Sequence, residues 1–305
     1  MTLAASHRFP GDAIESPHRL ALGLRPLPRD ACWLELDEDF EADLAEKRRL
    51  LAEHRRQVFV ELPTSRSAQE EVLHRVTSAL VETYPDQFVF EEGRLRRRGQ
   101  DAPFACDERV ESPLERAALH VQEDLCVMER RPEGWCLTAG CVCFPTRWDL
   151  PSKLGRSLDG IHERVPGYRE QLGRPTERFF ESMKRGRVYR RSNWSLMDDP
   201  ALFQPLEKLR SRPVRASRAD EAGDGIWLRV ERQTLQHLPA SDAVLFSIRV
   251  HRMTLAELSR DAETARRLLG AIESMEPAMQ VYKSLGAVRD ATFDYLASKL
   301  ALKQA

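Results

Sequence analysis

The sequence predicts an α+β protein built around a mainly antiparallel sheet. Helical patterns occupy the beginning of the chain, strand patterns with short helices between them occupy the middle, and helical patterns return at the end. Such segregation of strands from helices is typical of α+β architecture. Because the strands do not alternate with long helices, a doubly wound nucleotide-binding fold is disfavoured. The sequence contains no internal repeat.

The composition limits the classes of protein to which the chain can belong. Its 305 residues suffice for one large domain or two small ones. The net charge of -1 gives no global field that would attract nucleic acid. No apolar run approaches the ~18 residues that span a bilayer, and the first 25 residues lack the order of a secretory signal. Six unevenly spaced cysteines favour a reducing compartment. We therefore expect a cytoplasmic protein without nucleic-acid or membrane partners.

The N-terminal part is predicted to hold an irregular arm, three helices and one strand. Four prolines prevent a long helix in residues 1–30. The second helix is predicted to open at Ser67, because Ser67-Ala68-Gln69-Glu70 resembles a capping box. Residues 88–90 and the following Gly93 predict a strand and a turn. Apolar residues at helical spacing mark the first and third helices, namely Phe40, Leu44, Leu51 and Val58, then Leu114, Ala118, Val121, Leu125 and Met128.

The remaining elements alternate between strands and short helices until residue 255. Two short helices are predicted over 151–162 and 174–184, and residues 210–224 are polar and loop-like. Residues 255–303 are predicted to be helical, with Pro277 dividing them in two. Alternation of apolar and polar residues predicts the strands, which cover 135–144, 189–196, 226–235 and 243–250.

Several common catalytic and binding motifs are absent from the sequence. It contains no glycine-rich dinucleotide or phosphate loop, no G-x-S-x-G elbow and no H-E-x-x-H pair. Cys136, Cys141 and Cys143 give the spacing C-x4-C-x-C, which is one residue short of the plant-type ferredoxin pattern. Because no cysteine follows Cys143, an iron–sulfur cluster would lack its fourth ligand. We interpret these cysteines as small strand residues.

His162 is the candidate ligand residue. It ends a helical stretch and precedes the Pro166-Gly167 turn, and an imidazole held at a helix end is a suitable ligand for a metal or for haem iron. The alternative is an ordinary surface or core histidine.

Two of the predicted strands carry rows of polar residues. Arg191 and Asn193 share one strand face, opposite Trp194. On another strand, Arg229, Glu231 and Gln233 share a face, and burying them without partners would be unfavourable. Either this face is solvated, or its charges pair with one another or with a ligand.

From about Leu24 to Leu255 the chain resembles the α-subunit family of haem-dependent oxidative N-demethylases. Two opening runs, 23–27 (GLRPL) and 33–39 (WLELDED), resemble the start of the family. Six internal blocks then follow in order, and their order makes the resemblance specific. The blocks are 122–125 (QEDL), 143–148 (CFPTRW), 153–155 (KLG), 161–162 (IH) with 165–168 (VPGY), 191–195 (RSNWS) and 228–235 (LRVERQTL).

The resemblance implies a PAS-like fold that binds haem b through a histidine. Such an enzyme would act as a monooxygenase, using O2 to oxidise a methyl group of a small secondary amine such as dimethylamine and releasing formaldehyde. NADPH would supply electrons through a separate reductase subunit that carries FMN and a [2Fe-2S] cluster. The lack of nicotinamide, flavin and complete iron–sulfur motifs in this chain agrees with that division. The expected organisation is an arm (1–30), a PAS-like haem domain (31–255) and C-terminal helices (256–305).

The resemblance also assigns roles to residues of the matched blocks. His162 is the only histidine inside them, so it is the expected axial ligand to iron. The candidates for binding the haem propionates are Arg147, Lys153, Arg191 and Arg229, since guanidinium groups pair with carboxylates in bidentate fashion. The candidates for walls of the haem slot are Trp148, Tyr168 and Trp194, for which an ordinary core position is the alternative. The candidates for the catalytic, distal side are Asn193, Glu231 and Gln233.

Two other functions remain open at this point. One is a haem-binding PAS sensor or gas-binding protein without turnover, although residues 255–303 are short for an output domain. The other is a structural protein without cofactor, in which His162 is a turn residue and the Arg-bearing strands are solvated.

Overall fold

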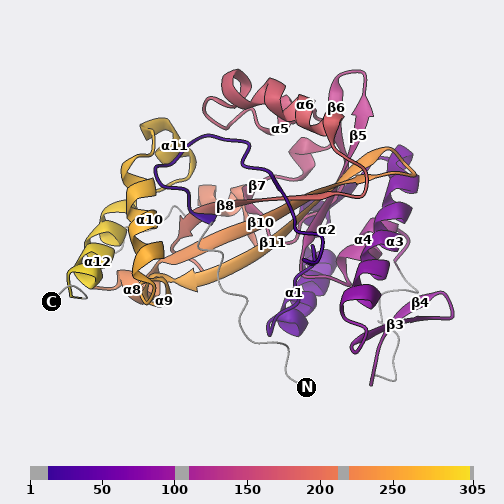
Figure 1. Ribbon diagram of the computed structural model, residues 1–305, viewed down its shortest axis with the longest axis horizontal. Coiled ribbons are helices and arrows are strands. Elements are labelled where there is room, and N and C mark those ends of the chain that lie inside the picture. Colours follow the sequence, from indigo (N-terminus) through magenta and orange to yellow (C-terminus); the bar gives the residue numbers. More distant parts are fainter. Residues whose placement is uncertain (1–12, 100–109, 212–219, 303–305) are drawn as a thin grey trace.

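A seven-stranded, fully antiparallel sheet is the centre of the protein (Figure 1). The computed structural model describes residues 13–99, 110–211 and 220–302. The order of the strands across the sheet is β1-β8-β10-β11-β5-β6-β2. Their bounds are β1 Arg25–Pro26, β2 Phe59–Glu61, β5 Asp124–Arg131, β6 Gly134–Cys141, β8 Val188–Met197, β10 Trp227–Leu238 and β11 Ala243–Thr254. The predicted α+β class with a mainly antiparallel sheet is confirmed.

Strands β10 and β11 form the longest hairpin of the sheet. Their twelve residues each pair from Trp227 opposite Thr254 to Leu238 opposite Ala243. The turn between them contains Asp242 in the left-handed region, with a φ of 56°. Both strands lie where period-two alternation predicts them, and each extends beyond its predicted end because pairing continues past the alternating residues.

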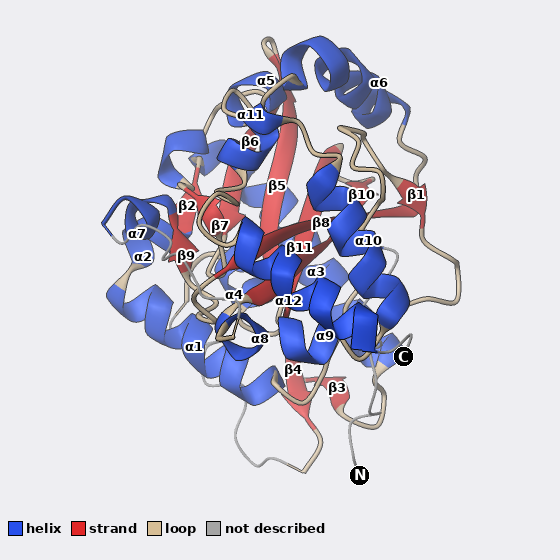
Figure 2. Ribbon diagram, turned by 90° about the vertical axis from the view of Figure 1, so that its left-hand side faces the viewer, coloured by secondary structure: helices blue, strands red, loops and turns tan. Residues whose placement is uncertain are grey.

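Helices cover both faces of the sheet and one of its ends. Figure 1 shows α5 and α6 above the sheet, α1, α3 and α4 below it, and α10 to α12 beside its left-hand end. In Figure 2 the C-terminal helices stand in front of β8 and β11. The bounds of the helices are α1 Phe40–Glu53, α2 Arg55–Val58, α3 Arg66–Thr83, α4 Pro113–Ala118, α5 Leu158–Ile161, α6 Arg174–Ser182, α7 Leu206–Ser211, α8 Ala222–Gly225, α9 Leu255–Leu258, α10 Ala262–Glu273, α11 Pro277–Tyr282 and α12 Arg289–Leu302.

Small elements connect these layers. Two-stranded pairs form from β3 Phe88–Glu91 with β4 Arg94–Arg97, and from β7 Thr146–Trp148 with β9 Gln204–Pro205. Short 3-10 turns cover Pro63–Ser65 and Pro151–Lys153, and a π-helical turn covers Arg169–Gly173. None of the helices in the described ranges is both long and apolar enough to cross a membrane.

Three apolar clusters hold the layers together. Below the sheet, α1, α3 and α4 bury residues such as Leu44 and Val72. At the C-terminal end, α10 and α12 pack on Trp194 and Val230. Above the sheet, α6 packs through Phe180 in a cluster with residues of β5, β6, β10 and β11. The candidate ligand segment 158–168 belongs to this upper layer.

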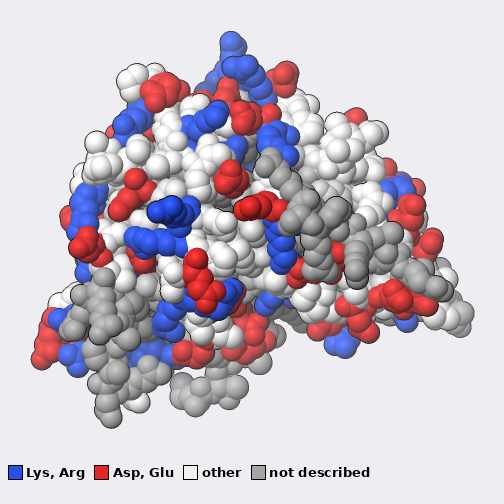
Figure 3. All heavy atoms as spheres, turned by 180° about the vertical axis from the view of Figure 1, so that it is seen from behind, with Lys and Arg blue, Asp and Glu red and all other residues white. Residues whose placement is uncertain are grey.

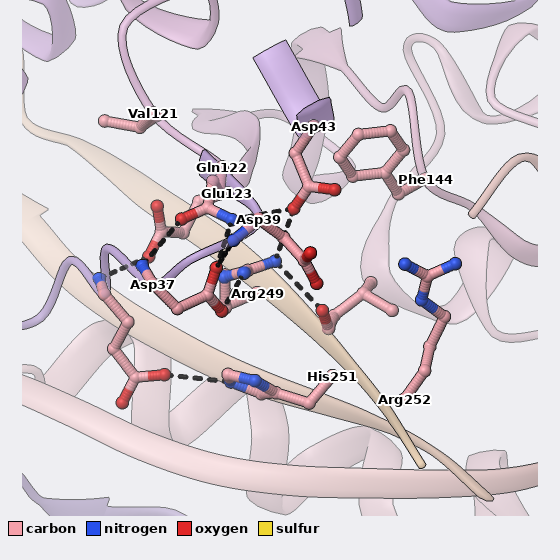
Figure 4. A network of polar contacts seen from close by, with 12 residues as sticks. Asp37, Asp39, Asp43, Val121, Gln122, Glu123, Phe144, Arg249, His251 and Arg252 are labelled. Carbon is pink, nitrogen blue, oxygen red and sulfur yellow. Dashed lines mark hydrogen bonds and ion pairs between the residues drawn. The ribbon is translucent and has the colours of Figure 1, made fainter. Parts of the chain in front are cut away.

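A buried polar network fastens the segment before α1 to the sheet (Figure 4). The guanidinium of Arg249 is 2% exposed and donates to the carboxylates of Asp37 and Asp43. The amide of Gln122 donates to the same two carboxylates, at 2.8 and 2.7 Å. Two runs of the sequence that resemble the family, 33–39 and 122–125, therefore meet here. A buried charge with several partners of this kind holds the geometry of the segment.

The prediction of a third helix through Leu125 and Met128 is wrong. Helix α4 ends at Ala118, and both residues lie on β5. Strand β5 is paired on both sides, and its residues from Asp124 to Met128 are buried whichever way they point. An apolar run that is buried all round shows no period, so a spacing of three or four there does not distinguish a helix from a strand.

The predicted capping box at Ser67 is also wrong. Helix α3 already begins at Arg66, and its N-cap Ser65 makes no capping bond through its side chain. A capping box is formed instead at α9, where Thr254 Oγ1 accepts from the backbone N–H of Glu257 and the Glu257 carboxylate accepts in return.

The predicted helix over 151–162 is interrupted. Gly155 has a φ of 74°, which ends the first turn, and α5 starts only at Leu158. Pro277 begins α11, as its position between the two C-terminal helical stretches predicts.

The surface has no dominant sign of charge on the face seen in Figure 3. Lys and Arg side chains are interspersed there with Asp and Glu. This mixture agrees with the net charge of -1.

Candidate functional site

His162 is held by the short helix that precedes it. Ser157 caps α5 by accepting a hydrogen bond from the backbone N–H of Gly160 at 3.4 Å. His162 follows the last residue of α5, and its Nδ1 lies 2.8 Å from the carbonyl oxygen of Leu158. Since a carbonyl can only accept, Nδ1 carries the proton and Nε2 keeps its lone pair. Within the described ranges, Nε2 makes no hydrogen bond. The imidazole is therefore fixed in the tautomer that can ligate through Nε2.

The surroundings keep this imidazole neutral. Burial lowers the pKa of His162 to about 4, and the nearby cations Arg191 and Lys153 act in the same direction. The hydrogen bond to Leu158 opposes this shift only in part. A neutral imidazole is the form that binds a metal, so the site needs no deprotonation at neutral pH.

The ring of Tyr168 stacks on the imidazole of His162. The two ring centroids are 4.3 Å apart and the planes differ by 13°. Tyr168 is buried, and it follows Gly167, whose φ of 72° makes the turn that returns the chain to His162. Stacking of a buried ring, together with the bond from Nδ1, fixes the plane of the imidazole. Tyr168 therefore adjoins His162, and its role as a wall of a haem slot stays a prediction.

The polar residues of β8 and those of β10 lie side by side, because the two strands pair in the sheet. Their register places Asn193 opposite Glu231 and Arg191 opposite Gln233. The carboxylate of Glu231 accepts from the amide of Gln233 at 2.8 Å and, through the same oxygen, from the amide of Asn193 at 3.5 Å. The three candidates for the distal side therefore form one hydrogen-bonded group.

Arg191 links this group to the histidine. Its guanidinium lowers the pKa of His162. Glu231 and Tyr168 in turn raise the pKa of Arg191. Burial lowers the pKa of Arg191 from its usual value, and its Nε is enclosed without a hydrogen-bond partner in the described part of the chain. A half-buried guanidinium with an open donor is suited to an anionic group.

Lys283, from the loop after α11, also reaches this group. Its ammonium is buried and donates to Oδ1 of Asn193 at 2.9 Å and to the carbonyl of Trp194 at 2.6 Å. Burial lowers the pKa of Lys283 to about 8. The positive charges of Arg191 and Arg147 lower this pKa further, whereas the Glu231 carboxylate raises it. Sequence reasoning missed Lys283 because it lies in a stretch that shows only helical periodicity, and no local signal marks it.

Arg229 lies at the same face, but its donors are already occupied. It is 2% exposed and donates to Thr146 Oγ1 at 2.9 Å and to the carbonyls of Phe144 and Leu202 at 2.7 and 3.0 Å. Burial lowers its pKa to about 10. Arg229 thus holds the chain segments around β7 and β9 in place, and its role toward a propionate stays a prediction.

The other predicted site residues are less closely associated. Arg147, with a φ of 57°, donates to the backbone carbonyl of Lys283 and so ties β7 to the loop after α11. Lys153 is buried, with its ammonium 3.8 Å from the Glu163 carboxylate, and burial lowers its pKa. Trp194 is buried in the cluster with the C-terminal helices, and the ammonium of Lys283 lies 5.1 Å from the centre of its ring. Trp148 is half-buried and packs against the cluster above the sheet.

A cavity lies elsewhere in the molecule. It encloses about 500 Å³ between α3, α4 and the β3–β4 pair, and His74, Phe90 and Arg116 are among its lining residues. None of the predicted site residues lines it. In the described ranges, no three or more His, Cys, Asp or Glu side chains are grouped so that they could hold a metal ion.

Comparison with known protein families gives one match over most of the chain. The model of the family described as haem-dependent oxidative N-demethylase, alpha subunit-like, matches residues 23–293. The matched range contains His162, Arg191, Glu231 and Lys283. It extends past residue 255, where the resemblance recognised from the sequence ended, and so includes α9 to α11.

Proposed function

Because the chain belongs to the haem-dependent oxidative N-demethylase, alpha subunit-like family, we propose that it is the haem-binding subunit of an oxidative N-demethylase. Its substrate is a small secondary amine such as dimethylamine, and its products are formaldehyde and the demethylated amine. Electrons come from NADPH through a separate reductase subunit with FMN and a [2Fe-2S] cluster. In this proposal haem b would bind in a PAS-like arrangement between the upper face of the sheet and α5 and α6, and the enzyme would act as a monooxygenase in the cytoplasm.

The observation that carries this proposal is the state of His162. Nδ1 donates to the Leu158 carbonyl, Nε2 makes no hydrogen bond within the described residues, and the low pKa keeps the ring neutral. A ligating histidine almost always donates its other N–H to a carbonyl, carboxylate or water, which fixes the tautomer and raises the basicity of the ligating nitrogen. His162 would then hold the haem iron through Nε2.

The charges around His162 also suit a haem. The positive charges of Arg191 and Lys153 both lower the pKa of the His162 imidazole, so these side chains lie near it. Burial lowers the pKa of each of the two cations. Burying cations in this way is unfavourable unless anions compensate them. The two propionates of haem b supply such anions, and Arg191, Lys153 and Arg147 are the side chains to hold them.

The group of Glu231, Gln233 and Asn193 forms the substrate side of the pocket. Haem supplies the O2 and one-electron chemistry that no side chain of the chain provides. Both amides donate to one oxygen of Glu231, so the other oxygen is left to accept an N–H of the amine. Accepting that bond would fix the nitrogen of the amine at the carboxylate and so limit the positions of its methyl groups.

An absorption spectrum of the full chain after supplementation with haem tests the proposal. We expect a Soret band in the native protein and its loss or shift in His162→Ala. Absence of the band in the native protein would refute haem binding, and an unchanged spectrum in the variant would refute His162 as the ligand. NADPH-driven release of formaldehyde from dimethylamine, with a reductase present, then separates the enzyme from a haem-binding sensor without turnover.

A further inference from the structure

Two cations adjoin the group that Glu231 forms with Gln233 and Asn193, since Arg191 pairs with Gln233 across the strands and Lys283 donates to Asn193. Among the carboxylates, Glu231 raises the pKa values of Arg191 and Lys283 the most. The positive charge of Arg147 also lowers the pKa of Lys283. The carboxylate of Asp198 raises the pKa of Arg147 and so offsets part of its charge. Arg191 receives only a weaker contribution from Glu15, which itself lies 3.8 Å from Arg25. Glu231 is the one carboxylate of this hydrogen-bonded group, and Arg191 and Lys283 are two cations that adjoin it.

Both cations retain N–H donors without a hydrogen-bond acceptor in the described residues. An ammonium group has three donors. Lys283 donates to two acceptors, Asn193 Oδ1 and the Trp194 carbonyl, and its Nζ also lies 5.1 Å from the centre of the Trp194 ring. Arg191 has an enclosed Nε without a partner in the described ranges. Unused donors on buried cations are unfavourable, because the groups have lost water without gaining an acceptor. The pair is therefore prepared for an anion that accepts hydrogen bonds.

A simple dialkylammonium ion does not supply that anion. It carries one positive charge, and Glu231 alone would accept it, which would leave Lys283 uncompensated, and Arg191 as well unless a propionate reaches it. A ligand with a carboxylate would neutralise the surplus charge, and a planar carboxylate matches the donors of a guanidinium group.

We propose that Arg191 and Lys283 form a carboxylate-binding pair beside Glu231. The proposal rests on the function proposed above, because it concerns the ligands of the same site. The carboxylate has two chemical sources. One is a propionate of the haem, and the other is the substrate itself, which would then be a zwitterionic N-methyl amino acid whose ammonium group binds Glu231.

Matched variants separate the charge from general effects on the fold. Lys283→Met and Arg191→Met each remove one cation of the pair. Lys283→Gln keeps a donor for Asn193 without the charge, in case the methionine variant does not fold. Lys299→Met is the control, because Lys299 is an exposed lysine of the same C-terminal region that also lies over an aromatic ring, 5.3 Å from Tyr295.

Two measurements on the full chain distinguish the sources of the carboxylate. The first is the rate at which excess apomyoglobin removes haem, compared with the rate for haem dimethyl ester, which has no free propionates. The second is the affinity for N-methylglycine and for dimethylammonium, from the change in the Soret band and from calorimetry. Loss of one charge-assisted hydrogen bond corresponds to about a tenfold effect or more.

Each outcome decides the proposal. Faster release of haem but not of its ester in the Arg191 and Lys283 variants identifies the propionate as the ligand. Weaker binding of N-methylglycine but not of dimethylammonium identifies the substrate carboxylate. Variants that match Lys299→Met in both measurements overturn the pair. If the native chain shows no Soret band, the proposed function fails separately. Calorimetry with N-methylglycine then decides the pair alone, and absence of binding to the native chain overturns it.

Discussion

The Nδ1–H group of His162 donates to the carbonyl oxygen of Leu158, one helical turn earlier, at 2.8 Å. This bond fixes the tautomer of the half-buried imidazole and leaves the lone pair on Nε2. The carbonyl belongs to the first residue of α5, so the four residues of that helix aim the imidazole. The interruption at Gly155 separates α5 from the turn before it, and this allows α5 to take its own direction.

If the environment of Nε2 is preformed, a free imidazole should replace the side chain. In His162→Gly we expect loss of the native Soret band and its recovery on addition of imidazole, because the cavity left behind retains the Leu158 carbonyl as an acceptor. Absorption spectra at increasing imidazole concentration measure this. A variant that regains no band would indicate that the rest of the pocket collapses without the histidine.

Tyr168 should matter through its ring and not through its hydroxyl. The ring stacks on His162 at 4.3 Å, so Tyr168→Phe should retain the haem spectrum and the rate of haem loss. Tyr168→Ala should release haem at least several times faster, since both the stacking and the burial of an aromatic ring are lost. Transfer of haem to apomyoglobin compares the two variants, and equal rates in Phe and Ala variants would contradict a role for stacking.

The free energy of unfolding of the haem-free chain should depend on pH in the way that the lowered pKa of Lys283 predicts. Its folded pKa of about 8 lies below the ordinary lysine value of 10.5, so between these pH values the unfolded chain binds more protons than the folded one. The free energy of unfolding therefore gains from this group as the pH rises through that window, by at most about 3 kcal/mol.

Urea unfolding of the native protein and of Lys283→Met at pH 7.5 to 10.5 measures this difference, because other titrating groups contribute equally to both. The advantage of the native protein over the variant should grow with pH. A difference that is constant or shrinks would show that the lysine is not desolvated in the folded chain.

Arg229 should contribute to stability more than to binding. In Arg229→Met the carbonyls of Phe144 and Leu202 lose their donor while they stay buried, which should cost about 2–4 kcal/mol of unfolding free energy. Arg191→Met should cost less, because no hydrogen bond within the described residues depends on its Nε. Urea unfolding checks both. If Arg229→Met proved as stable as Arg191→Met, its contacts with the segments around β7 and β9 would not be important for folding.

The sequence by itself determined the fold class, the long strands and the composition of the polar face. Alternation places Arg191 with Asn193 and Glu231 with Gln233, and the register of β8 with β10 confirms that both pairs share one face. Such patterns are local, because the side-chain direction along a strand repeats every two residues. The choice of His162 as the candidate ligand rests instead on its place in the blocks that resemble the family, and it stays a proposal.

Only the tertiary structure decided which of these polar side chains remain available. Arg229 and Arg191 look alike in the sequence, yet one is saturated by backbone carbonyls and the other keeps an open donor. Lys283 joins Asn193 across 90 residues, and the periodicity of its own segment says nothing of that contact. Strand β5 was mistaken for a helix because burial on all sides removes the period. Contacts between distant segments depend on how the layers pack, and that information is not contained in any local pattern of the chain.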